Sequence, residues 1–160
     1  MGKKDDKTNV MRVLDKAKIN YSFRKYEPNA SLTGGEIARL LGEEPEKVFK
    51  TLVTVSKSKE HYVFMLPVEK ELDLKKAARA AGEKNIEMIA QKELLSLTGY
   101  VPGGCSPIGM KKQFKTFIDE SARQFDTIMF SAGKVGYQVE IATADAERLI
   151  PLCFADLAKQ

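Results

Sequence analysis

The sequence predicts an α+β fold, because strand-like and helix-like segments are mixed along the chain and two of the strands are close enough to form a hairpin. Segments 49–55 and 61–66 consist mainly of apolar and β-branched residues, which is typical of buried strands. The polar segment 56–60 between them has the length of a hairpin turn. Amphipathic segments with helix caps occur on both sides of this hairpin. We therefore expect a mixed, mainly antiparallel sheet flanked by helices, rather than a doubly wound sheet.

The N-terminal region predicts a helix followed by a strand. The helix is expected to begin after a cap at Thr8 or Asn9. Its apolar residues recur at positions i, i+3, i+4 and i+7: Val10, Val13, Leu14 and Ala17. Segment 21–26 then alternates aromatic and polar residues, which predicts a strand.

A second, short helix is expected from its capping pattern. Thr33 and Glu36 have the spacing of a capping box, and Gly42 is well placed to end the helix. Its expected buried face consists of Ile37, Leu40 and Leu41. Pro45 is expected to open a further helical turn.

Caps and glycines delimit the remaining elements. Asp73 is expected to cap a helix that runs to Ala81 and is closed by Gly82. Segment 99–109 contains four glycines and two prolines, which predicts a shaped loop. The other expected elements are helices around 91–97 and at 143–149, and strands at 115–119, 127–130 and 137–141.

Length and composition indicate an ordinary globular protein. The 160 residues are typical of one domain, so we expect residues 1–160 to form a single domain. Apolar residues make up 43% and charged residues 30% of the chain. No apolar segment is long enough to span a bilayer and no signal peptide is recognisable, which predicts a cytoplasmic protein without a membrane partner. The net charge of +4 permits an RNA partner without requiring one.

Residues of the common catalytic and metal sites are scarce. His61, the one histidine, stands at the edge of the predicted hairpin turn, where a solvated histidine is more common than a catalytic base. Cys105 and Cys153 are far apart and form no CxxC motif, so we expect neither a metal site nor a disulfide. No phosphate-binding or dinucleotide-binding glycine motif is present, and no cofactor is expected. An enzyme with this sequence would lack a standard nucleophile.

Three segments are unusual for a purely structural protein. Lys50 interrupts the apolar segment 48–53, where it either extends along the surface or places a cation at the mouth of a pocket. The glycines of segment 99–109 either shape a connector or let backbone N–H groups meet a ligand, and segment 131–136 is a weaker example of the same kind. The lysines beside these loops would follow a nucleic-acid backbone or form an ordinary charged surface: Lys111, Lys112, Lys115 and Lys134.

Taken in this order, these segments resemble the YbaK/EbsC family of free-standing aminoacyl-tRNA deacylases, which is related to the editing domain of some prolyl-tRNA synthetases. The specific combination is KTL at 50–52 with GGCSPIG at 103–109. The similarity covers almost the whole chain, in segments 26–28, 48–53, 72–77, 99–112, 117–120 and 131–136, with Glu140 beyond them.

The resemblance implies an α+β deacylase of Cys-tRNA(Pro), with Cys-tRNA(Cys) as a further substrate and prolyl-tRNA synthetase as a further partner. In this family the thiol of the esterified cysteine is understood to attack its own carbonyl, which agrees with the missing enzyme nucleophile. By motif position, Lys50, Gly103 and Gly104 would be the catalytic groups. The substrate-binding residues would be Tyr26, Thr33, Thr51, Cys105, Ser106, Ser131 and Gln138.

Two positions depart from the family pattern. Gln138 stands where better-known deacylases carry an acidic residue, and Cys105 takes a position that is more often aliphatic. We interpret Cys105 as a small buried side chain, because no basic neighbour in the sequence would clearly lower its pKa. The rival hypotheses are an alanine-clearing deacylase that uses water, a non-catalytic module that binds tRNA or a nucleotide, and a surface or regulatory protein without an RNA role.

Overall fold

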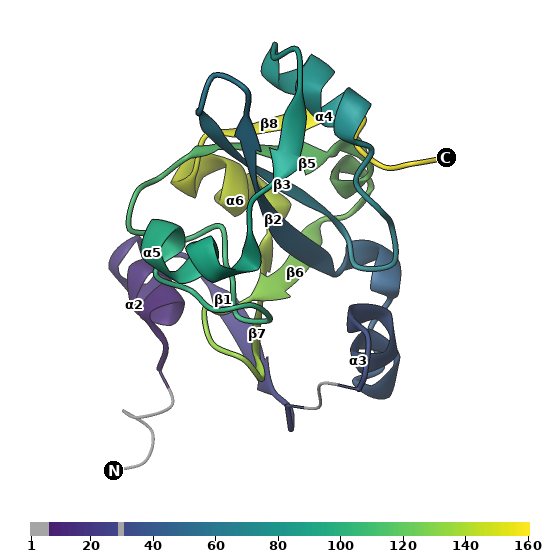
Figure 1. Ribbon diagram of the computed structural model, residues 1–160. Coiled ribbons are helices and arrows are strands. Elements are labelled where there is room, and N and C mark those ends of the chain that lie inside the picture. Colours follow the sequence, from purple (N-terminus) through teal and green to yellow (C-terminus); the bar gives the residue numbers. More distant parts are fainter. Residues whose placement is uncertain (1–6, 29–30) are drawn as a thin grey trace.

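Two sheets joined by a bridge form the framework of the computed structural model, which describes residues 7–28 and 31–160 (Figure 1). The smaller sheet is antiparallel, in the order β1 (Tyr21–Lys25), β7 (Tyr137–Ala142) and β6 (Thr127–Ser131). The larger sheet has the order β4 (Ile86–Met88), β2 (Phe49–Ser56), β3 (His61–Pro67), β5 (Lys115–Asp119) and β8 (Leu152–Ala155). An isolated parallel bridge between Val48 and Met129 brings the start of β2 against β6.

The predicted α+β class and the mainly antiparallel pairing are confirmed. The hairpin is present, with Phe49 opposite Pro67 and Val55 opposite His61. Only the pairs β3–β5 and β5–β8 are parallel among the described strands. The division into two sheets was not predicted, and neither were β4 and β8. These two edge strands have three and four residues, which is too short for a clear alternation of apolar and polar positions.

The predicted helices are present with their predicted caps. Thr8 Oγ1 accepts a hydrogen bond from the Met11 N–H at 3.2 Å, and the capping box of Thr33 and Glu36 is formed in both directions. Gly82 ends its helix in the left-handed conformation, with φ of 73°. The helices are α2 (Asn9–Lys16), α3 (Gly34–Leu40), α4 (Leu74–Ala81), α5 (Leu94–Thr98) and α6 (Thr143–Leu149), with 3-10 turns at Pro45–Lys47, Gln91–Glu93 and Glu120–Gln124.

Two predicted buried positions were wrong. Ala17 lies beyond the end of α2 and is exposed. Leu40 is 74% exposed, because α3 packs on the bridge between the sheets through Ala38. Two residues further along a helix correspond to a rotation of about 200°, which turns Leu40 away from the sheets.

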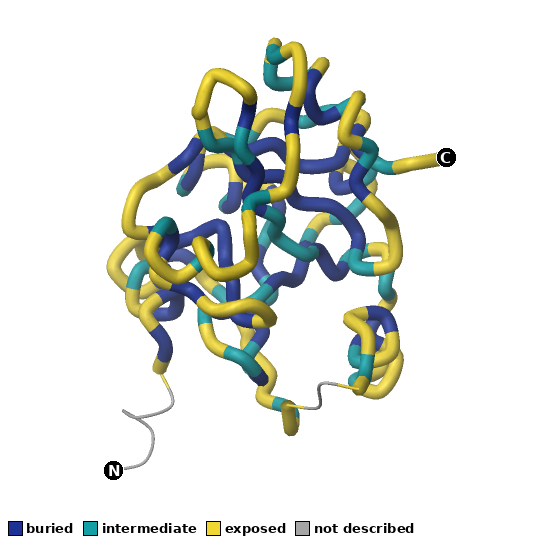
Figure 2. The backbone as a smooth tube through the Cα atoms, in the orientation of Figure 1, coloured by how far each residue is buried: buried dark blue, intermediate teal, exposed yellow. Residues whose placement is uncertain are grey.

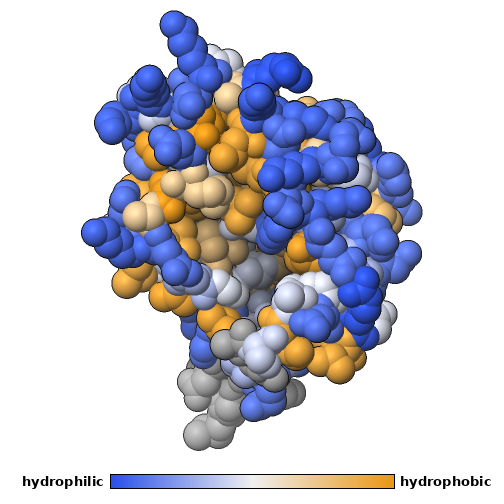
Figure 3. Space-filling model, turned by 45° about the vertical axis from the view of Figure 1, so that its right-hand side comes forward, coloured by the Kyte–Doolittle hydropathy of each residue, from blue (hydrophilic) through white to orange (hydrophobic). Residues whose placement is uncertain are grey.

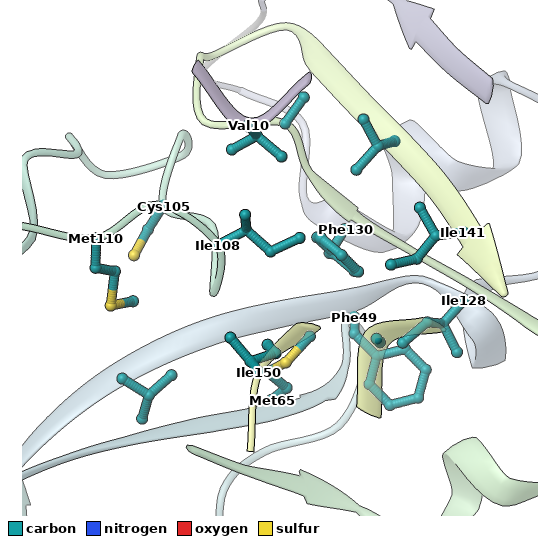
Figure 4. Close-up of a cluster of buried hydrophobic side chains, with 14 of the residues drawn as sticks. Val10, Phe49, Met65, Cys105, Ile108, Met110, Ile128, Phe130, Ile141 and Ile150 are labelled. Carbon is teal, nitrogen blue, oxygen red and sulfur yellow. The ribbon is translucent and has the colours of Figure 1, made fainter. Parts of the chain in front are cut away.

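The larger hydrophobic core fills the space between the two sheets. Figure 4 shows Phe49 and Met65 from the larger sheet facing Ile128, Phe130 and Ile141 from the smaller one. A second cluster lies on the other face of the larger sheet, beneath α4. The middle of the larger sheet is therefore buried on both faces, as Figure 2 shows. In the part of the chain that the structure describes, no helix has the length and apolar character needed to cross a membrane.

Candidate active site

A cavity of about 690 Å³ opens where the start of β2 meets β6. Its walls come from β2, β6, β7, α3, the glycine-rich loop after α5 and the described residues between β1 and α3. Figure 3 shows one side of the molecule, hollowed near its centre and bordered by apolar surface. The structure brings seven of the predicted site residues together in the cavity wall: Tyr26, Lys50, Thr51, Gly103, Cys105, Ser131 and Gln138.

Three predicted site residues lie outside this wall. The Thr33 hydroxyl accepts the Glu36 N–H as the cap of α3, and the residue is exposed. Ser106 is fully buried, and its Oγ accepts the Ile108 N–H at 3.3 Å. Gly104 does not line the cavity, and a Cβ added to it would lie 3.0 Å from the Val135 nitrogen in the loop between β6 and β7. Each of the three has a structural explanation that is independent of a ligand.

Lys50 and Thr51 lie at the start of β2 and offer two polar groups to the cavity. Lys50 is half-buried; burial lowers the pKa of its ammonium group, and the Glu71 carboxylate opposes this shift. Thr51 Oγ1 is buried and has no hydrogen-bond partner among the described residues. A buried polar group without a partner costs about 1–3 kcal/mol, so a ligand that bonds to this hydroxyl would recover that cost.

The glycine-rich loop enters the cavity through a tight turn. The Gly104 N–H donates to the Val101 carbonyl at 2.9 Å, which closes a β-turn with Pro102 and Gly103 at its centre. Gly103 has φ of 84°, the conformation that the third position of a type II turn requires. The Gly104 N–H is therefore occupied. The N–H groups of Gly103 and Cys105 take part in no hydrogen bond within the described chain, and both residues line the cavity.

The loop between β6 and β7 closes the opposite side. Ser131 Oγ accepts the Gly133 N–H at 3.1 Å, which leaves the Ser131 hydroxyl hydrogen for a ligand. The Tyr26 N–H donates to the Gly136 carbonyl at 2.8 Å. An added Cβ at Gly136 would lie 2.8 Å from the Tyr26 backbone carbonyl oxygen, so this close approach of the two backbone segments requires glycine. Burial raises the pKa of the Tyr26 phenol, which keeps it protonated at neutral pH.

Gln138 connects the cavity to a buried carboxylate. In the amide orientation that satisfies both groups, Gln138 Nε2 donates to Glu43 Oε2 at 2.6 Å and to Oε1 at 3.1 Å. The Glu43 side chain has no exposed surface, and Arg24 Nη1 lies 3.2 Å from its Oε2. Burial raises the pKa of Glu43, while Arg24 and the Gln138 hydrogen bond oppose the shift. The family pattern has an acidic residue at position 138. In this chain the acidic group at this place is Glu43, which follows α3, and Gln138 is its hydrogen-bond partner.

Among the described residues, the cavity wall shows no activated nucleophile. Cys105 is buried, as expected from the sequence. Burial raises the pKa of its thiol to about 12, which keeps the thiol neutral at physiological pH. His61 does not line the cavity; its ring packs against Phe114, with 5.4 Å between the ring centroids. The described residues include no group of three or more His, Cys, Asp or Glu side chains that could hold a metal ion.

The lysines beside the loops are exposed. Three of them lie over aromatic rings: Lys112 over Phe114, Lys115 over Phe117 and Lys134 over Tyr137. A Cβ added at Gly104 would lie 3.3 Å from the Lys134 carbonyl carbon, so this lysine is next to the glycine-rich loop. A cation at this position could attract a phosphate backbone toward the opening.

Sequence reasoning missed Glu43 and several apolar wall residues. Glu43 follows Gly42 in a polar segment, and nothing local distinguishes it from a solvated loop residue. Ile37, Pro102 and Val135 line the cavity, but their positions were assigned only to a helix face and to loops. For these three wall residues, the glycine-rich composition around Pro102 was the one sequence feature that pointed to a ligand site.

Comparisons with known proteins relate the chain to editing enzymes. The model of the aminoacyl-tRNA editing domain matches residues 27–149. EbsC of Enterococcus faecalis, which carries the provisional name Cys-tRNA(Pro)/Cys-tRNA(Cys) deacylase, is 46% identical over 143 residues, or 88% of this chain and 86% of EbsC. A proline–tRNA ligase of Shouchella clausii is 30% identical over 105 residues, or 66% of this chain but 18% of the ligase.

The fold also has a counterpart among solved structures. A crystal structure described provisionally as a trans-editing enzyme for prolyl-tRNA synthetase superimposes with a TM-score of 0.79 at 24% identity. The superposition covers 96% of this chain and 99% of that structure. This likeness shows that the two chains share the same α+β fold.

Proposed function

Because the chain belongs to the aminoacyl-tRNA editing domain family and is an aminoacyl-tRNA deacylase, we propose that it removes cysteine from mischarged Cys-tRNA(Pro) in trans. Cys-tRNA(Cys) is the second proposed substrate, as the name of EbsC suggests. We place the protein in the cytoplasm, with prolyl-tRNA synthetase as a further partner that supplies the mischarged tRNA.

One observation carries the proposal: the cavity combines several donors for an oxyanion with no activated nucleophile among its described residues. Lys50 and the N–H groups of Gly103 and Cys105 can stabilise negative charge on an ester carbonyl oxygen. The Cys105 thiol is neutral at physiological pH, so it is a weak nucleophile. A substrate that carries its own nucleophile fits such a cavity better than one that needs an enzyme base.

The proposed reaction is an intramolecular acyl transfer. The thiol sulfur of the esterified cysteine attacks its own carbonyl carbon, so that a carbon–sulfur bond forms and the bond to the ribose oxygen breaks. The thiol proton passes through solvent to the ribose oxygen, and the products are free tRNA and a cyclic thiolactone. The protein holds the ester in the reactive geometry and stabilises the charge that develops on the carbonyl oxygen.

The test is a comparison of tRNA(Pro) charged with cysteine, serine, alanine or proline. We expect cysteine to be removed at least about a hundredfold faster than serine, a barrier difference of ~2.7 kcal/mol. A thiol is partly ionised at neutral pH and a serine hydroxyl is not, whereas binding alone separates groups of such similar size weakly.

Other outcomes would assign a different function. Similar rates for serine and cysteine would indicate attack by water. A higher rate for alanine would indicate the alanine-clearing deacylase. Tight tRNA binding without turnover of any of the four substrates would indicate a non-catalytic module.

A further inference from the structure

We propose that Glu43 is a positioning residue that holds the Gln138 amide with its carbonyl oxygen toward the cavity, where this oxygen accepts a hydrogen bond from the α-amino group of the aminoacyl ester. The inference rests on the proposed function and deepens it. It assigns recognition of the amino group to a pair of residues from two distant parts of the chain.

The geometry selects one orientation of the amide. Gln138 lines the cavity, and the Glu43 carboxylate lies behind it without exposed surface. With the nitrogen toward Glu43, the amide donates to both carboxylate oxygens, at 2.6 and 3.1 Å. With the oxygen toward Glu43, acceptors would face acceptors and the hydrogen bonds would be lost. An ionised Glu43 therefore leaves the Gln138 carbonyl oxygen as the acceptor for a ligand.

The other polar groups of the cavity suit a different part of the substrate. Lys50 and the N–H groups of Gly103 and Cys105 are donors, which complement a carbonyl oxygen or a phosphate. An aminoacyl ester also presents a donor close to its carbonyl, which is the α-amino group. An amide oxygen polarised by a buried carboxylate is a strengthened acceptor for that donor, because hydrogen bonds in series polarise one another.

The hydrogen bonds between Glu43 and Gln138 couple recognition of the substrate amino group to the protonation state of Glu43. A protonated Glu43 can donate to the amide oxygen, which would reverse the amide and turn its donor side toward the cavity. Burial raises the pKa of Glu43, so this reversal occurs at a higher pH than for an exposed carboxyl group. The charged and titratable groups around Glu43 are Arg24, Lys47, Glu140 and Tyr26.

The test compares Cys-tRNA(Pro) with N-acetyl-Cys-tRNA(Pro), which keeps the thiol and the ester but changes the amino group to an amide. We expect the wild-type protein to prefer the free amine by at least about tenfold in kcat/KM, a difference of ~1.4 kcal/mol. Glu43→Gln and Gln138→Met should lose most of this preference, because kcat/KM should fall more for the free amine than for the acetylated substrate. Glu140→Gln removes a carboxylate from the same strand as Gln138 but outside the cavity wall, and should keep the preference.

A structural role for Glu43 predicts equal losses on both substrates, and that result would overturn the inference. A folded Glu43→Gln variant that keeps the full preference would do the same. If Glu43→Gln and Gln138→Met both fail to fold, the pH dependence of the wild-type protein still tests the proposal. Its preference for the free amine should disappear as the pH falls through the Glu43 pKa, and a preference that is constant down to acidic pH contradicts the proposal.

Failure of the proposed function gives a separate signal. If no charged tRNA is deacylated, binding of L-cysteine methyl ester and of N-acetyl-L-cysteine methyl ester is measured by NMR titration. A preference for the free amine that Glu43→Gln abolishes supports the positioning role without turnover. Equal affinity of the wild-type protein for the two esters overturns it.

Discussion

Replacement of Lys50 by methionine should separate activity from stability. The variant keeps an unbranched, apolar side chain of similar length but removes the charge from the cavity wall. A charge pair about 4 Å apart is worth about 4 kcal/mol at an effective dielectric constant of about 20. Because Lys50 is half-buried, we take about half of this value for its effect on a developing oxyanion, which corresponds to a rate loss of about 30-fold.

The stability of this variant should not fall. Burial lowers the pKa of Lys50, so the folded state disfavours its charged form. For a lysine with a lowered pKa, the stabilising contribution is present above the ordinary lysine pKa and is lost as the pH falls through the lowered pKa. At pH 7 the ammonium group therefore opposes folding, and Lys50→Met should unfold at the same temperature as the wild type or higher.

The assay is single-turnover deacylation of Cys-tRNA(Pro), with thermal unfolding followed by circular dichroism. Lys84→Met is the matched control, because it removes the same charge from an exposed position outside the cavity wall. A folded Lys50→Met variant with a rate within about threefold of the wild type would refute the role of the ammonium group. An equal loss in Lys84→Met would assign the effect to general attraction of tRNA.

Three further predictions concern the cavity and its surroundings. In Gly104→Ala the new Cβ would lie 3.0 Å from the Val135 nitrogen, so the loop must shift. This shift should lower kcat/KM by about tenfold and the free energy of unfolding by about 1 kcal/mol. Cys105→Ala and His61→Ala should each keep the deacylation rate within about tenfold, because burial raises the pKa of the Cys105 thiol and His61 does not line the cavity. Near-complete loss of activity in a folded variant would mean that the protein supplies a nucleophile or base. Burial raises the pKa of Glu43, so its stabilising contribution is present below the ordinary glutamate pKa and is lost as the pH rises through the raised value. Urea unfolding should therefore show Glu43→Gln gaining stability relative to the wild type as the pH rises above the ordinary glutamate pKa, and a difference that is constant with pH would contradict this.

Local patterns were sufficient for much of the fold. The hairpin of β2 and β3 and the caps of α2, α3 and α4 depend on residues close in sequence, so alternation and cap spacing predicted them. The division into two sheets depends on pairings such as β1 with β7 and β5 with β8. Those pairings join segments separated by long stretches of chain, and local periodicity contains no information about them.

The site shows the same limit. Lys50 and the glycine-rich loop were recognisable because a cation in an apolar strand and a cluster of glycines are unusual in themselves. Glu43 acquires its role only through burial against Gln138, which is 95 positions away (138 minus 43). The hydrogen bond of the Gly104 N–H could not be predicted from the sequence either. It belongs to a turn that depends on the positive φ of Gly103, which composition alone does not determine.

The long-range assembly of the cavity wall has a consequence for the protein during its synthesis. Tyr26 and Gln138 lie at opposite ends of the set of wall residues, and β7 must pair with β1 before either is in place. Contacts between such distant segments form late, because the intervening chain loses entropy when its ends are brought together. The cavity is therefore incomplete in a nascent chain that lacks β7, and deacylase activity should appear only after the segment that contains β7 has left the ribosome.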